Sequence, residues 1–234
     1  MRTLTPTRGA LCLLAGLLAV VMIGACGGSM TPGVLAPTIA TITTLPSIDE
    51  MLSPKTLGSA SAQNTIIEYV SFWCSACKDF YLTGDGAQMK TQYADTGRAQ
   101  ITFRNLFVNS ETFAAADLAR CAGNARFFDA VDTIFKNQAS WLGAGDPDAP
   151  VKSLMLGFGM SQSVINACVG NTALENGVWQ IFVDAMTATY VRPDGTSQVG
   201  FSYVPAIVVN GTVLDGGTSD NAPTLANIEK FLKK

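Results

Sequence analysis

The chain has 234 residues, of which 48% are apolar and 14% are charged, and its formal net charge is −3. This composition can bury a core, which excludes a disordered chain, and a mildly acidic protein lacks the basic footprint of a nucleic-acid binder. There is no histidine, so the commonest metal ligand and the Ser-His and Cys-His nucleophile pairs are excluded.

The first residues have the pattern of an export signal. Arg2 and Arg8 precede an unbroken run of apolar and small residues, 9–23, and IGAC follows at 23–26. A positive segment, an apolar segment and a small-residue processing site are typical of a signal peptide, which we expect to span residues 1–25. Such a signal places the rest of the chain outside the cytoplasm, where disulfides form and persist.

The ending IGAC resembles the lipobox of bacterial lipoproteins. The resemblance implies that Cys26 is acylated and becomes the first residue of the mature protein. The protein is then expected in the cell envelope, on the periplasmic or another extracytoplasmic side, and lipid-anchored to a membrane. The alternatives are an uncleaved membrane anchor and an ordinary signal peptide with a coincidental cysteine.

A segment rich in Gly, Pro, Thr and Ala follows this cysteine. Residues 27–47 contain no charged side chain, a composition that favours a flexible connection. We therefore expect a flexible tether over residues 26–48, which would lift the domain from the membrane. The alternative is that the strand-like stretch TIATITTL packs on the domain.

Four cysteines follow these segments: Cys74, Cys77, Cys121 and Cys168. Cys74 and Cys77 lie within one helical turn if a helix begins there, and Cys121 then pairs with Cys168 by elimination. The second pair sits in apolar helical patterns with no charged or aromatic frame to activate it, which predicts a structural disulfide. A four-thiolate zinc site is the alternative, but such a site normally uses two close pairs and fits this spacing poorly.

A predicted strand runs directly into the first of these cysteines. TIIEYVSFW, residues 65–73, is rich in β-branched and aromatic residues, and a helix is expected over 75–93 with a break near two glycines in its middle. The free N–H groups and positive end of that helix are expected to lower the pKa of Cys74 and make it the attacking and leaving thiol. Cys77, one turn inside, is expected to be the resolving thiol.

An acidic residue and a proline extend this pattern. Glu68 lies in the apolar strand, where desolvation is expected to raise its pKa, so that it could relay a proton to or from Cys77. An edge-exposed acid with a satisfied partner is the alternative. Pro205 precedes the predicted strand AIVVN and the hairpin signal NG, and such a proline can be cis.

Helical periodicity dominates the middle of the chain, between a strand at 101–108 and Pro205. The aromatic stretches FFDAVDTIF and VWQIFVDAM have the spacing of helices buried in a core rather than of a binding face. The chain ends in the amphipathic pattern APTLANIEKFLKK. Helices in the middle block are predicted over 111–124, 125–139, 150–159, 161–169 and 172–190.

The run EYVSFWCSACKDF, the segment YVPAIVVNG and the terminal helix together resemble the DsbA-like branch of the thioredoxin superfamily, which contains exported thiol–disulfide oxidoreductases. The resemblance implies an α/β protein that has a thioredoxin fold with an inserted all-helical domain. The first thioredoxin part is expected over residues 49–108, the helical insertion over 109–195 and the second thioredoxin part over 196–234.

The same resemblance assigns roles to residues of this chain. Cys74 becomes the nucleophile, Cys77 the resolving cysteine and Glu68 the buried acid below them. Pro205 becomes a cis-proline that faces the pair, and the residues expected to contact substrate are Val204, Pro205 and Trp73. The strongest oxidants of the branch often carry proline and histidine between the cysteines, whereas this sequence has Ser75 and Ala76, and it has valine where a hydroxyl residue often precedes the cis-proline.

These observations predict an envelope oxidase that turns substrate thiols into disulfides through Cys74 and Cys77, without a metal or bound cofactor. Its expected partners are exported proteins that contain cysteines and a membrane redox partner that resets the pair, and it is expected to act as a monomer. One alternative is a reductase or isomerase with the same site. Another is a non-catalytic lipoprotein that binds a partner through a thioredoxin-like scaffold.

Overall fold

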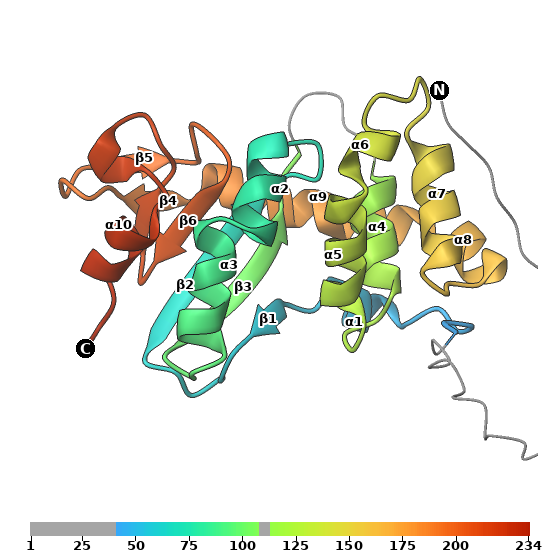
Figure 1. Ribbon diagram of the computed structural model, residues 1–234, viewed down its shortest axis with the longest axis horizontal. Coiled ribbons are helices and arrows are strands. Elements are labelled where there is room, and N and C mark those ends of the chain that lie inside the picture. The colour runs from blue at the N-terminus through green and yellow to red at the C-terminus, as the bar shows by residue number, and fades with distance from the viewer. Residues whose placement is uncertain (1–40, 108–112) are drawn as a thin grey trace, which may run out of the picture. The chain divides into compact units, whose positions relative to one another are not determined.

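The described residues contain a mixed seven-stranded β-sheet. The computed structural model describes residues 41–107 and 113–234, which belong to one compact unit. Its strands are Lys55–Leu57 (β1), Asn64–Val70 (β2), Ala99–Asn105 (β3), Thr189–Val191 (β4), Ser197–Val199 (β5), Ala206–Val209 (β6) and Thr212–Leu214 (β7). The strand order is β1-β3-β2-β6-β7-β4-β5 (Figure 1).

Strand β2 lies inside the sheet and leads to the cysteine pair. It pairs in parallel with β3 and antiparallel with β6, so Glu68 lies opposite Phe103 on one side and Ile207 on the other. The β-branched and aromatic residues of this segment suit a strand that is covered on both faces. The strand expected over 65–73 is therefore present, but it ends at Val70.

The helix expected over residues 75–93 is broken into three shorter pieces. These are Ser75–Leu82 (α2), Asp85–Met89 (α3) and the π-helix Lys90–Ala94 (η1). The break falls at Gly84, where glycines predicted it. A side chain at the neighbouring Gly86 would come within 2.5 Å of the Phe80 ring, so the close packing of α2 on α3 requires glycine there.

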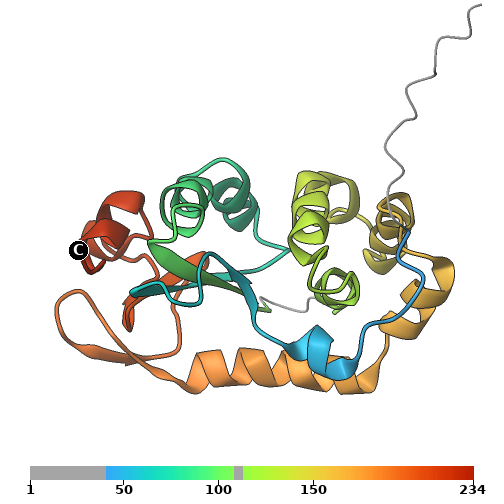
Figure 2. The ribbon, with the colours of Figure 1, turned by 90° about the horizontal axis from the view of Figure 1, so that it is seen from below.

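The two faces of the sheet are covered by different helices (Figure 2). The pieces α2, α3 and η1 pack on one face together with α10, Leu225–Lys230. The opposite face is covered by the long helix α9, Thr172–Thr187, whose Phe182 and Ala185 pack with Tyr69 and Val213. The part of the protein that contains the cysteine pair therefore has three layers: helices, the sheet and helix α9.

An all-helical block interrupts the sheet between β3 and β4. Its helices before α9 share one buried core with the sheet, in which Phe103 of β3 lies against Phe127. Helix α9 ends at Thr187, and β4 begins at Thr189. The helix expected over 172–190 therefore ends earlier than predicted, and its last two expected residues belong to a strand. The bounds are Ala114–Cys121 (α4), Phe127–Lys136 (α5), Gln138–Trp141 (α6), Asp148–Gly157 (α7) and Gln162–Cys168 (α8).

The second cysteine pair lies within this block. Cys121 ends α4 and Cys168 ends α8, and the two form a disulfide in which the Cα atoms are 6.2 Å apart. Both cysteines are fully buried. The sulfur of Met51 lies 3.4 Å from that of Cys121, so the disulfide is surrounded by protein rather than presented to substrate.

The segment before the sheet corrects the expectation of a tether that continues to residue 48. Ile42 forms a parallel bridge with Met160, in which its N–H donates to Gly159 and its carbonyl oxygen accepts from Ser161. The short helix α1, Ile48–Leu52, follows directly. Backbone pairing fixes the segment, as the strand-like pattern TIATITTL allowed. The remainder of the expected tether, the signal peptide at 1–25 and Cys26 lie outside the described residues.

Candidate active site

Cys74 lies where the central strand gives way to a helix. Strand β2 ends at Val70, and Cys74 is the N-cap of α2, with its sulfur accepting a hydrogen bond from the N–H of Cys77 at 3.0 Å. The side chain is partly exposed, whereas Cys77 is fully buried. The first thiol is therefore open to a substrate and the second is shielded behind it.

The surroundings drive the pKa values of the two thiols apart. The hydrogen bond from the Cys77 thiol, together with the backbone N–H groups of Cys77 and Ala76, lowers the pKa of Cys74 to about 7 against the effect of its partial burial. The hydrogen bond to Cys74 and burial raise the pKa of Cys77 well above its usual range. A thiolate therefore forms at Cys74, which suits it to attack and to leave in disulfide exchange.

The segment that contains Pro205 approaches Cys74 from a part of the chain far away in sequence. The peptide bond between Val204 and Pro205 is cis, and strand β6 begins with the next residue. The sulfur of Cys74 lies 3.7 Å from the carbonyl oxygen of Val204. The backbone of Val204 is therefore next to the sulfur at which a substrate would react.

Glu68 is buried below the pair, with only 1% of its surface exposed. Burial raises its pKa to about 7, while the charge of Lys90 acts in the opposite direction. One carboxylate oxygen has no hydrogen-bond partner, and the charge of Glu68 contributes to the raised pKa of Cys77. The carboxyl group can therefore change its protonation state near neutral pH beside the buried thiol.

Lys90 is a site residue that sequence reasoning missed. It begins η1, and its ammonium nitrogen donates to the carbonyl oxygen of Tyr81 at 3.0 Å and lies over the ring of the same tyrosine. Burial lowers its pKa, and the charge of Glu68 raises it in return. No local pattern marks a lysine in a helix as the partner of an acid in a distant strand.

Trp73 and its neighbours connect the site to the helical insertion. The ring of Trp73 packs edge-on against that of Trp141, with 6.0 Å between their centroids. The side-chain amide of Gln138, a second residue that sequence reasoning missed, donates to the carbonyl oxygens of Phe72 and Cys74. The loop that carries Cys74 is therefore held by hydrogen bonds from the insertion, and substrate contact by Trp73 stays a prediction.

Asp215 is the third missed residue, and it positions the loop before Pro205. It is fully buried, and one of its oxygens accepts from the N–H of Ser202 at 2.7 Å and from the side-chain amide of Gln198 at 3.0 Å. Its other oxygen accepts from Asn221 at 2.6 Å. These hydrogen bonds fix Ser202, two residues before Val204. The sequence gives little indication of this role, because Asp215 is simply the one acidic residue in the stretch TVLDGG.

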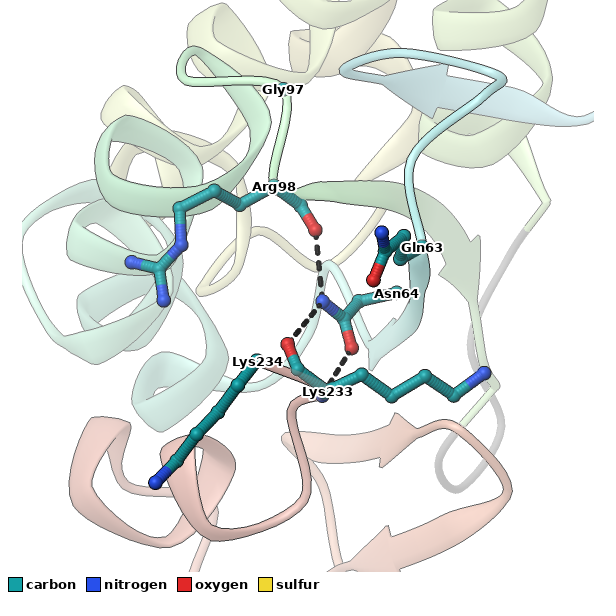
Figure 3. A pocket seen from close by; sticks show the side chains of 6 residues that line it. All are labelled: Gln63, Asn64, Gly97, Arg98, Lys233 and Lys234. Atoms are coloured by element: carbon teal, nitrogen blue, oxygen red, sulfur yellow. Dashed lines mark hydrogen bonds between the residues drawn. The ribbon is translucent and has the colours of Figure 1, made fainter.

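Another hollow, at the opposite end of β2, lacks the features of a reaction site (Figure 3). The side chain of Asn64 there bonds to the backbone of Arg98 and of Lys233, which holds the C-terminal segment against the sheet. In Figure 3 the side chain of Lys233 extends to the right, whereas those of Arg98 and Lys234 extend to the left with their charged ends apart, so the three do not converge on a common ligand.

Two features are absent from the part of the chain that the structure describes. Over 41–107 and 113–234, no group of three Cys, Asp or Glu side chains is placed to hold a metal ion. In the same ranges, no helix combines the length and apolar character that crossing a membrane requires.

Comparison with known proteins agrees with this geometry. The family model described as thioredoxin matches residues 52–234. No curated protein matches the chain in sequence. Among solved structures, the chain is similar to a protein-disulfide isomerase from Novosphingobium aromaticivorans, with 22% identity and a TM-score of 0.59 over 76% of this chain and 94% of the other.

Two more solved structures show the same fold. Alpha-DsbA1 from Wolbachia pipientis is 20% identical, with a TM-score of 0.59 over 77% of this chain and 91% of the other. BdbD from Bacillus subtilis, in its oxidised form, is 18% identical, with a TM-score of 0.59 over 81% and 97%. The expected fold class, a thioredoxin fold with an inserted all-helical domain, is thereby confirmed.

Proposed function

This chain belongs to the thioredoxin family, and on that premise we propose that it is a thiol–disulfide oxidoreductase of the cell envelope that oxidises the cysteine thiols of exported proteins. The observation that carries the proposal is the asymmetry of the pair. Cys74 is partly exposed with a lowered pKa, and Cys77 is buried with a raised pKa. Disulfide exchange needs one accessible thiolate and one protected resolving thiol.

The reaction begins from the form in which Cys74 and Cys77 share a disulfide. A substrate thiolate attacks the sulfur of Cys74, the bond to Cys77 breaks, and Cys77 leaves with the electron pair and takes up a proton. A second substrate thiolate then attacks the substrate sulfur of the mixed disulfide, and Cys74 leaves as a thiolate. Two electrons pass from the substrate to the pair, and the substrate gains a disulfide.

Glu68 is proposed as the donor of the proton that Cys77 takes up. A thiolate at Cys77 would be buried and unfavourable, and the carboxyl group of Glu68 has a pKa of about 7, so it can carry a proton at neutral pH. Val204 and Pro205 are proposed to grip the substrate backbone next to Cys74. No metal or bound cofactor enters these steps.

A reductase with the same site is the second candidate, and one observation favours it. The pKa of Cys74 is lowered only to about 7. The corresponding cysteine has a pKa of about 7 in thioredoxin and of about 3.5 in a strong oxidant. The residues between the cysteines, Ser75 and Ala76, supply no further positive charge to the thiolate.

The reduction potential of the Cys74 and Cys77 pair separates the two candidates. It would be measured in glutathione and dithiothreitol buffers on the chain from residue 26 with Cys26→Ser, so that only the two pairs remain. A value above about −180 mV supports the oxidase, and a value near about −270 mV supports the reductase. A Cys74→Ser chain separates both candidates from a non-catalytic binding role: exchange with model disulfides should vanish if the site is catalytic, whereas the phenotype of a binding protein should survive the substitution.

We also propose where the protein acts and with what. The signal pattern at 1–25 and the lipobox-like IGAC support acylation at Cys26 and a lipid anchor in the cell envelope. Its proposed partners are exported proteins with cysteines and a membrane protein that resets the pair, and the domain is proposed to work as a monomer. Metabolic labelling with a fatty acid should mark the wild-type chain and not Cys26→Ser.

A further inference from the structure

A hollow beside helix α9, away from the cysteine pair, is lined by three cations. It lies where the connection from α1 to β1 meets β3 and α9, and Figure 2 shows α1, in blue, against α9, in orange. The cations come from three elements: Lys55 from β1, Arg104 from β3 and Arg120 from α4. Every other residue of the lining is uncharged.

Two of these cations are buried without a carboxylate partner. Lys55 and Arg120 are each 3% exposed. None of the ion pairs among the described residues includes Lys55, Arg104 or Arg120. A buried charge is unfavourable unless a charge of opposite sign lies beside it. A negative group in the hollow would therefore be strongly favoured.

The acids that act on these cations do not neutralise them. Asp117 lies one turn before Arg120 on α4, but neither of its carboxylate oxygens has a hydrogen-bond partner among the described residues. Burial raises the pKa of Asp117 to about 8, so it is mostly protonated at neutral pH. Lys55 bonds to the carbonyl oxygen of Glu50, while a carboxylate oxygen of Glu50 accepts from the backbone N–H of Asn124.

The two guanidinium groups keep N–H groups for a ligand. One nitrogen of Arg120 donates to the carbonyl oxygen of Met51 at 2.8 Å, and one nitrogen of Arg104 donates to the hydroxyl of Tyr69 at 3.2 Å. Each guanidinium has five N–H donors, so most remain for an oxygen atom in the hollow. The ammonium group of Lys55 instead donates to neutral oxygens of Glu50, Ser53 and Asn124, and it contributes its charge.

The cations repel one another in a lining that is already held in place. Burial, followed by the charge of Arg120, lowers the pKa of Lys55 to about 8. Burial also lowers the pKa of Arg120 to about 10, where the charge of Asp117 opposes the shift and that of Arg104 adds to it. An anion between them would relieve this repulsion, and a fixed lining loses little conformational entropy on binding.

We propose that this hollow binds a phosphate group, carried by inorganic phosphate, a small phosphate monoester or a lipid. Guanidinium groups match the oxygens of phosphate, and three positive charges favour a dianion over a singly charged carboxylate. The hollow measures about 210 Å³, below the roughly 300–1,000 Å³ of pockets for drug-sized ligands. It therefore suits one phosphate group rather than a nucleotide.

Bound phosphate would connect two parts of the fold. Arg104 belongs to the sheet and Arg120 to the helical insertion, so one anion that bonds to both would hold these parts together. The inference goes beyond the proposed thiol chemistry and does not depend on it. Failure of either proposal therefore leaves the other intact.

The test titrates the purified protein with sodium phosphate, with sodium chloride keeping the ionic strength constant so that screening does not change. Calorimetry should show saturable binding of one phosphate per chain. A hundred-fold excess over Kd should raise Tm by about 5–10 °C. Acetate should bind at least about ten-fold more weakly than phosphate, and acetate that binds equally well would overturn the assignment of a phosphate group.

Further ligands identify the source of the phosphate group. Binding of inorganic phosphate or glycerol 3-phosphate supports a soluble source. Binding only to phosphatidylcholine vesicles that contain phosphatidic acid, and not to those without it, supports a lipid source. If none of these three ligands binds saturably, the inference is overturned.

Variants locate the site. Arg104→Gln and Arg120→Gln should each weaken binding by about ten-fold or more, because each removes charge-assisted hydrogen bonds to the anion. Arg98→Gln is the matched control, since Arg98 is exposed and lines the hollow of Figure 3 instead. Binding that is lost in Arg98→Gln and kept in Arg104→Gln would overturn the inference. Circular dichroism shows whether each variant is folded, and the half-buried Arg104 keeps the test valid if Arg120→Gln does not fold.

Discussion

The side-chain amide of Gln138 lies 3.1 Å from the carbonyl oxygen of Cys74, to which it donates a hydrogen bond. The same nitrogen donates to the carbonyl oxygen of Phe72 at 2.7 Å, and Gln138 itself is 3% exposed. Gln138 belongs to α6 of the helical insertion. The insertion therefore holds the loop that carries Cys74, the proposed nucleophile.

Gln138→Ala should weaken both the fold and the exchange reaction. Two carbonyl oxygens would lose a buried donor, which costs about 1–3 kcal/mol in the free energy of unfolding, and the loop that carries Cys74 would lose its tie to the insertion. Urea unfolding and the rate of disulfide exchange measure the two effects. Gln162→Ala is the control, since Gln162 is exposed and its side-chain amide donates to Asn166 on the same helix. Equal effects of the two substitutions would contradict the assigned role.

The thiol of Cys74 should titrate near pH 7 in the reduced protein. Its rate of alkylation by iodoacetamide should rise about ten-fold per pH unit below about 7 and level off above, because the thiolate is the reacting form. Folding lowers this pKa from an ordinary value of 9.0, so the reduced protein should gain free energy of unfolding as pH rises from about 7 to about 9. An alkylation midpoint near 9 would refute the assignment.

Glu68 should make the protein less stable as pH rises toward neutrality. Folding raises its pKa from 4.5 to about 7, so the stability gained from the protonated acid is complete below about 4.5 and is lost as pH rises through about 7. The loss should amount to roughly 3 kcal/mol in the free energy of unfolding. Comparing urea unfolding of wild type and Glu68→Gln from pH 4 to 8 isolates it, and parallel curves would argue against a buried titrating acid.

Asp215→Asn should impair substrate binding more than the chemistry of the thiol. Both oxygens of Asp215 accept hydrogen bonds, whereas the amide nitrogen of the new side chain is itself a donor and would face another donor. The loop with Ser202 and Val204 would therefore lose a hydrogen bond that supports it. We expect KM for protein substrates to rise several-fold while the pKa of Cys74 stays unchanged. Asp194→Asn, in an exposed turn, is the control. A shift in the pKa of Cys74 without a change in KM would point to a different role.

The parts of the fold that sequence reasoning predicted are those encoded locally. A β-branched strand, a CxxC and a helix occur in that order, and the NG pair forms the turn between β6 and β7, where Asn210 has φ +49° and Gly211 has φ +95°. Turn chemistry and hydrophobic period are properties of neighbouring residues. These elements can therefore be predicted from the sequence without the structure.

The parts that were missed depend on partners far away in the chain. Strands β1, β4 and β5 each have three residues, too few for a periodic signal. Gln138 bonds to Cys74 across 64 positions, and Lys90 meets a residue of β2 only once the sheet has formed. Nothing in the sequence near either residue distinguishes it from an ordinary polar position on a helix.

The buried core that joins the sheet to the insertion has a consequence for how the protein unfolds. Phe72, Tyr81 and Phe103 lie in one continuous cluster with Phe127 and Phe135. Separating the two parts would expose aromatic surface on both, which makes independent melting of either part unfavourable. The thioredoxin part and its insertion therefore form a single cooperative unit, and heat should denature the domain in one transition rather than two.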